Sequence, residues 1–78
     1  MFLPFAYSVG WATGVVAADP IVLSGIKASD IVLAMIKWKP GAAAAAVDPS
    51  TFVVTDNAIE SASVATDTYR VCVLWTRP

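Results

Sequence analysis

The chain has 78 residues, of which 58% are apolar and only 14% are charged, and its formal net charge is -1. This length fits one domain, and a domain of this size removes only about 60% of its unfolded surface from water, so the apolar excess predicts association with other protein surfaces. Five scattered Lys and Arg residues form no basic patch, which argues against a nucleic-acid partner.

Residues 1–18 contain no charged side chain. Pro4, Gly10 and Gly14 interrupt this segment, which does not favour a membrane span. It contains no basic n-region, which does not favour a secretory signal. We interpret residues 1–19 as an apolar arm that precedes a β domain of residues 20–78. Aromatic anchors dominate interfaces, so the arm is expected to contact another subunit, and the alternative is that it covers its own domain or adds a strand to it. The predicted anchors are Phe2, Phe5, Tyr7 and Trp11.

Short apolar runs separated by turn residues predict a small all-β domain. Residues 15–18 and 21–24 flank an Asp19-Pro20 turn and predict two short strands or one bent strand. Residues 30–38 are the strongest predicted strand, and both of its faces are apolar, which places it centrally in a sheet or beneath a partner. One face is expected to carry Ile31, Leu33 and Met35, and the other Val32, Ala34, Ile36 and Trp38.

The second half of the chain predicts a loop, two turns and three more strands. Five alanines follow Gly41, too few for a stable helix, so a loop or one helical turn is expected there. Residues 48–50 predict a turn before a strand at 51–55, and Asp56-Asn57 predicts a hairpin turn into a weaker strand at 58–64. A turn at 66–68 precedes the last strand, at 69–76, whose core face is expected to carry Tyr69, Val71, Val73 and Trp75. The expected fold is an all-β, small single-domain antiparallel β-sandwich or barrel with an extended apolar N-terminal arm.

The residues that usually carry catalysis are scarce. The chain has no histidine, which removes the commonest general base and metal ligand, and its six carboxylates lie mostly beside turn residues, where they satisfy backbone donors. Cys72 is the only cysteine, so it forms neither an internal disulfide nor a zinc cluster, and we expect it to be a buried structural residue of the last strand. The sequence therefore predicts no enzymatic activity, no cofactor and no metal.

The order of strands and turns resembles that of small virion proteins of tailed bacteriophages. In those proteins a strand is followed by Gly-Ile/Val-Lys-x-Ser/Thr-Asp and a second apolar strand, as in residues 21–36 here, where the central segment is Gly25-Ile26-Lys27-Ala28-Ser29-Asp30. Residues 47–59, and residues 66–75 with the terminal strand, continue the resemblance. Proteins of this kind are similar to capsid decoration or cement proteins, compact β folds that sit as oligomers on the phage head.

The resemblance implies a structural virion protein of the capsid surface that stabilises the head by binding between major capsid subunits. The expected partners are the major capsid protein and further copies of the chain, as a trimer, because decoration proteins often occupy local three-fold positions. A membrane is not an expected partner. The predicted interface residues are Phe2, Phe5, Tyr7, Trp11 and Trp38. A tail or neck component, or a small membrane-associated protein that uses its apolar N-terminus, is the alternative.

Overall fold

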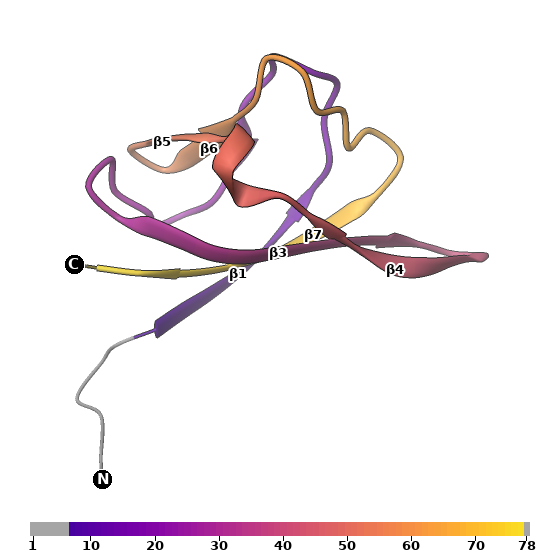
Figure 1. The fold of residues 1–78 in the computed structure, drawn as a ribbon, viewed down its shortest axis with the longest axis horizontal. Coiled ribbons are helices and arrows are strands. Elements are labelled where there is room, and N and C mark those ends of the chain that lie inside the picture. The colour runs from indigo at the N-terminus through magenta and orange to yellow at the C-terminus, as the bar shows by residue number, and fades with distance from the viewer. Residues whose placement is uncertain (1–6, 78) are drawn as a thin grey trace, which may run out of the picture.

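A computed structural model describes residues 7–77, which fold into β-strands and one short 3₁₀ helix (Figure 1). The strands form two antiparallel sheets, a larger one of order β1-β7-β3-β4 and a smaller one of order β2-β6-β5. This confirms the all-β prediction. The elements in chain order are β1 (Tyr7–Thr13), β2 (Ile21–Val22), β3 (Ile31–Lys39), β4 (Ala42–Val47), the 3₁₀ helix η1 (Pro49–Thr51), β5 (Val53–Thr55), β6 (Ala58–Glu60) and β7 (Arg70–Thr76).

The hydrophobic core lies between the two sheets. In Figure 1, β5 and β6 form the upper layer, and β1, β3, β4 and β7 form the lower one. Burial of these side chains is the main favourable term in folding. The larger sheet contributes Ala12, Met35, Val47, Val71, Val73 and Trp75, and the smaller sheet with its connections contributes Ile21, Leu23, Ile26 and Ile59.

The last strand, β7, has the two-residue alternation that its sequence predicts. Val71, Val73 and Trp75 are buried and face the core, as expected, because successive side chains of a strand point to opposite faces. Tyr69 precedes the strand and is only half-buried. The ammonium groups of Lys37 and Lys39 each lie 4.6 Å from the centre of its ring, and these cation-π contacts hold the Tyr69 ring against β3.

β3 lies between β7 and β4, as its two apolar faces predicted, but the predicted division of its side chains is wrong. Its register with β7 shifts between Val32 and Ala34, so an extra residue interrupts the alternation. Val32 and Met35 both pack on the core, whereas Leu33 is exposed. A bulge of one residue reverses the face of every side chain beyond it, which sequence periodicity alone does not reveal.

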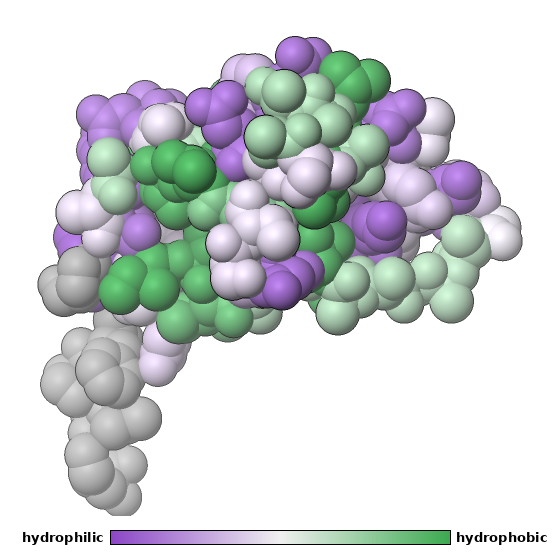
Figure 2. Space-filling view, turned by 45° about the horizontal axis from the view of Figure 1, so that its top comes forward, coloured by the Kyte–Doolittle hydropathy of each residue, from purple (hydrophilic) through white to green (hydrophobic). Residues whose placement is uncertain are grey.

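The prediction for the alanine run is also wrong, because residues 42–47 form β4 rather than a loop or a helical turn. This strand pairs antiparallel with β3, which supplies the hydrogen bonds that a short helix would have had to form alone. Gly41 has a φ of 82° in the turn between them, a conformation that glycine adopts without strain. The alanines form a pale-green string along the lower right margin of Figure 2.

One short predicted strand is absent from the structure, and three others are shorter than predicted. Residues 15–18 form no strand, because the chain there crosses from the larger sheet to the smaller one and bonds to a loop, with the Ala18 amide donating to the Ser61 carbonyl at 2.7 Å. The strands predicted at 21–24, 51–55 and 58–64 are shortened to β2, β5 and β6. The Asp56-Asn57 hairpin turn is confirmed, and Asn57 adopts a φ of 64° in it.

Residues 7–13 of the predicted N-terminal arm form a strand of the larger sheet. β1 pairs with β7 along seven residues, from Tyr7 opposite Thr76 to Thr13 opposite Arg70. The segment therefore adds a strand to its own domain, which is one of the two roles considered for it. Phe2 and Phe5 lie outside the described residues. Within residues 7–77 no helix has the length and apolar character needed to cross a membrane.

Candidate functional site

The side of the larger sheet that faces away from the smaller sheet is almost entirely apolar. The pairing of β1, β7 and β3 aligns side chains in rows on this side, because residues directly opposite in an antiparallel ladder share a face. Trp11, Cys72 and Ile36 form one row. We call this surface the outer face and define it by Tyr7, Val9, Trp11, Ile31, Ala34, Ile36, Trp38, Cys72 and Leu74.

Four large side chains of the outer face are at least half exposed, whereas Trp38 and Leu74 are half-buried. The exposed fraction is 62% for Trp11, 57% for Val9, 54% for Tyr7 and 50% for Ile31. A sheet with one face on the core normally carries polar residues on its solvated face. Three strands of seven residues cover about 330 Å² in projection. An apolar surface of this size matches the largest patch on a typical monomeric protein, which often has a function.

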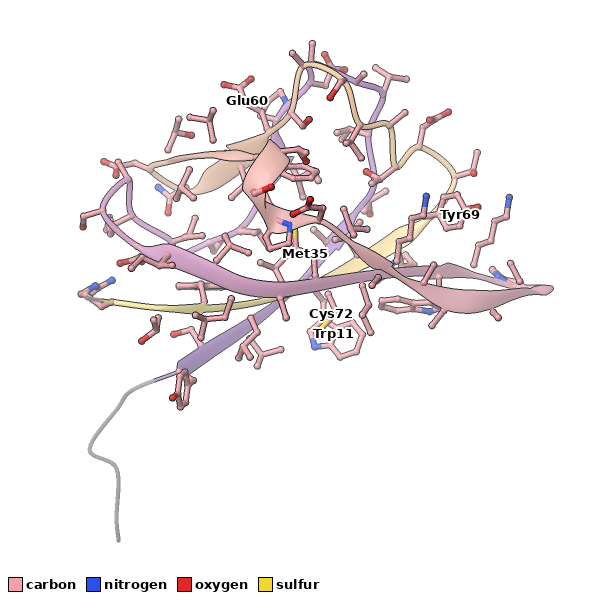
Figure 3. All side chains as sticks on the ribbon, viewed as in Figure 1. Trp11, Met35, Glu60, Tyr69 and Cys72 are labelled. Carbon is pink, nitrogen blue, oxygen red and sulfur yellow. The ribbon has the colours of Figure 1, made fainter. Side chains whose placement is uncertain are left out.

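Two tryptophans form a fixed aromatic pair on this surface. The rings of Trp11 in β1 and Trp38 in β3 meet edge to face, with centroids 5.0 Å apart and an interplanar angle of 89°. Because β7 lies between these two strands, the pair crosses it. Figure 3 shows Trp11 and Cys72 below the larger sheet, whereas Met35 projects into the space between the sheets. Rigid, partly exposed aromatic groups of this kind are frequent energetic centres of protein interfaces.

A shallow hollow of about 170 Å³ opens on the outer face between β3 and β7. Its walls are Ala34, Ile36 and Leu74, with Cys72 and Met35 completing the lining. The hollow therefore suits an apolar side chain and offers little to a charged ligand. Cys72 is half-buried here and not buried as expected, because it alternates with Val71 and Val73, which face the core.

Polar residues border the outer face at both ends of the strands. Thr13 lies opposite Arg70 at one end, and Thr76 lies opposite Tyr7 at the other. An apolar centre with a polar rim is the usual anatomy of a protein interface. The outer face has this arrangement along the direction of its strands.

The structure brings three of the five predicted interface residues together. Tyr7, Trp11 and Trp38 all lie on the outer face, and Phe2 and Phe5 lie outside the described residues. The sequence did not identify Val9 and Leu74 as surface partners of the tryptophans. The alternation of residues 70–76 already placed Leu74 opposite to the core face, but only the pairing of β1 with β7 shows that Val9 lies beside it.

The carboxylates of Asp30 and Asp48 accept hydrogen bonds from backbone amides outside the strands. The Asp30 carboxylate accepts a hydrogen bond from Arg77, which holds the pKa of Asp30 below its ordinary value, with a further contribution from the Lys27 amide. Asp48 caps η1 by accepting from the Ser50 amide, and this bond lowers the pKa of Asp48. No group of three or more metal-ligating side chains occurs within residues 7–77.

Comparison of the chain with protein-family models, with curated proteins and with solved structures found no match.

Proposed function

We propose that this protein is a structural subunit that acts by burying its outer face against another protein, in the manner of a capsid decoration protein. The observation that supports this proposal is the exposed apolar surface across β1, β7 and β3, with the Trp11-Trp38 pair on it and polar groups only at its ends. Contiguous apolar surface rimmed by polar residues is a sign of a binding site on a small protein.

The energetics of the outer face favour binding to an assembled array over binding to a single free subunit. Burial of about 330 Å² of apolar surface at about 25 cal/mol per Å² contributes a favourable free energy of about 8 kcal/mol, before the costs of association are subtracted. Association costs about 4–15 kcal/mol in lost freedom of motion, so one face alone gives modest affinity. Copies of the chain that are linked in one oligomer would bind an array more tightly, because binding of the first outer face raises the effective concentration of the others.

The decoration role itself is supported by the resemblance of residues 21–75 to small phage virion proteins. In this role the partner is the major capsid protein, the location is the capsid surface, and the effect is mechanical. A subunit that binds the assembled shell and not its free components stabilises the shell by linkage, without any reaction. A tail or neck component would use the same outer face against a different particle.

The proposal is tested by co-sedimentation of the purified chain with empty heads of tailed phages that lack decoration. Ile36 lies in the same row of the outer face as Trp11 and Cys72 and is 42% exposed, so Ile36→Lys places a charge in the proposed interface without opening the core. Val22→Lys is the matched control, because Val22 is 67% exposed on the smaller sheet.

We expect the unchanged chain to saturate the heads at a fixed ratio to capsid subunits. Ile36→Lys should bind at least tenfold more weakly, whereas Val22→Lys should bind like the unchanged chain. Circular dichroism of both variants shows whether each is folded. The proposal is wrong if the unchanged chain does not sediment with heads, or if Ile36→Lys binds as well as Val22→Lys. Binding to phosphatidylcholine vesicles in place of heads would favour the membrane alternative.

A further inference from the structure

The outer edge of β1 has, over residues 8–13, none of the features that usually prevent strands from pairing between molecules. Within residues 7–77, β1 lies at one end of the larger sheet and pairs only with β7. Its sequence, YSVGWAT, contains no charged residue and no proline. Its seven-residue register with β7 is uninterrupted, so no bulge turns the edge away. A long, regular and uncharged edge strand is a template for another strand.

The other sheet edges of the described residues are protected. β4, at the opposite end of the larger sheet, has an irregular register with β3 between Lys37 and Lys39, and such a bulge twists an edge strand away from a partner. In the smaller sheet the outer strands are β2 and β5, which have only two and three residues. Very short edge strands offer few backbone groups to a partner. β1 therefore stands out as the edge open to pairing.

The sequence of β1 fits a second copy of itself. In an antiparallel pair centred on Gly10, Val9 of one copy lies opposite Trp11 of the other. Both side chains belong to the outer face, so the outer faces of the two copies lie on the same side of the joined sheet. No charge faces a like charge across the pair, and the missing side chain of Gly10 leaves its centre open.

We propose that two copies of this protein pair through β1 across a two-fold axis, which makes one eight-stranded sheet with a doubled outer face. Such an isologous pair closes after two copies, so it differs from the trimer that the sequence analysis anticipated. The pairing does not depend on the outer face binding a capsid. Pairing would also strengthen binding to an array, because two outer faces on one rigid dimer bind an array more tightly than one outer face does.

The dimer is expected to be weak in dilute solution. A strand edge of seven residues is about 23 Å long and about 10 Å thick, so two copies bury about 460 Å² along the edge. This area is well below the roughly 1,200 Å² of stable complexes and belongs to transient association. The contacts of Val9 with Trp11 across the axis add to it. Dissociation constants between micromolar and millimolar are therefore expected.

The test is sedimentation equilibrium of the unchanged chain from micromolar to millimolar concentration, with Val9→Glu, Val9→Lys and Val53→Glu. Val9→Glu places an anion against the Trp11 ring of the second copy and brings two like charges close together across the axis. An equimolar mixture of Val9→Glu and Val9→Lys replaces this repulsion by an opposite-charge pair. Val53→Glu is the matched control, because Val53 is 63% exposed on β5, at the edge of the smaller sheet.

We expect dimers of the unchanged chain and of Val53→Glu, at least tenfold weaker dimers of Val9→Glu, and recovery in the Glu and Lys mixture. Hydrogen exchange should slow with concentration at every second amide of residues 8–13, which are those that point away from β7. The inference is overturned if the unchanged chain stays monomeric or forms trimers, or if the Val9→Glu dimer is as tight as the Val53→Glu dimer. It is also overturned if the Glu and Lys mixture shows no recovery, or if amides elsewhere in the chain become protected. Ile36 lies on β3, with β7 and β1 between it and this edge, so Ile36→Lys should still dimerise even if its binding to heads is lost.

Discussion

Replacement of Gly14 by alanine is expected to destabilise the fold strongly, although the backbone at this position suits alanine. Gly14 is not among the residues with a positive φ, so a methyl group adds no conformational strain. A Cβ atom built there would overlap the carbonyl oxygen of Thr66 and would lie 2.6 Å from the Thr66 carbonyl carbon and 2.8 Å from the Tyr69 oxygen. These are backbone atoms, so the collision is relieved only if β1 moves away from the loop at 66–69.

That movement breaks the hydrogen bonds that join the two segments. The Gly14 amide donates to Tyr69 and the Thr66 amide donates to Val15, both at 2.8 Å, and the Val15 amide donates to the Thr66 hydroxyl at 3.1 Å. Three bonds at about 1 kcal/mol each correspond to about 3 kcal/mol. A domain of this size has a free energy of unfolding of about 4–12 kcal/mol, so the loss is a large share of it. The expected fall in Tm is about 12–24 °C.

Thermal unfolding followed by circular dichroism measures this fall. Gly41→Ala is the control, since a Cβ at Gly41 meets open space and only the φ of 82° opposes it, at a cost of about 1 kcal/mol. Gly14→Ala should therefore have a clearly lower Tm than Gly41→Ala. If Gly14→Ala is as stable as Gly41→Ala, or more stable than the unchanged protein, the close approach of β1 to the loop at 66–69 is wrong.

Two further predictions concern polar contacts of the loops. The hydrogen bond from Arg77, followed by that from the Lys27 amide, lowers the pKa of Asp30 below its ordinary 3.8, so the stabilisation is present above that pH and is lost as the pH falls through the folded-state pKa. The Tm of the unchanged protein should therefore fall more steeply below pH 3.8 than that of Asp30→Asn, and parallel melting curves would contradict the ion pair. Asn57 has a φ of 64°, and its side-chain oxygen accepts from the Gly25 amide at 3.0 Å. Asn57→Gly should lose about 1 kcal/mol and Asn57→Ala about 2 kcal/mol, because alanine also strains the backbone. Denaturant midpoints check this order, and equal midpoints for the two variants would refute it.

Local sequence patterns predicted the elements whose side chains alternate strictly or whose turns need special residues. The alternation of residues 70–76 predicted β7 and its core face, and Asp56-Asn57 predicted a hairpin turn that the φ of Asn57 explains. These features depend on neighbours in the chain. Part of the candidate site also follows from local sequence, because aromatic residues in a charge-free segment predicted Tyr7 and Trp11 as interface residues, and the structure exposes more than half of each side chain.

Features that depend on pairing between distant segments were not predictable in this way. The alanine run became β4 because β3 supplies its hydrogen bonds, although no residue of the run favours a strand. The bulge in β3 arises from its register with β7 and decides that Met35 enters the core.

The sequence by itself therefore determined that this protein is all-β and has more apolar residues than a monomer of its size can bury. Only the tertiary structure decided where the surplus lies, by placing Trp11 and Trp38 on two strands that flank β7, with Cys72 between them. The physical reason is that alternation along a strand fixes two faces, whereas the register between strands decides which side chains share a face and which face the second sheet covers.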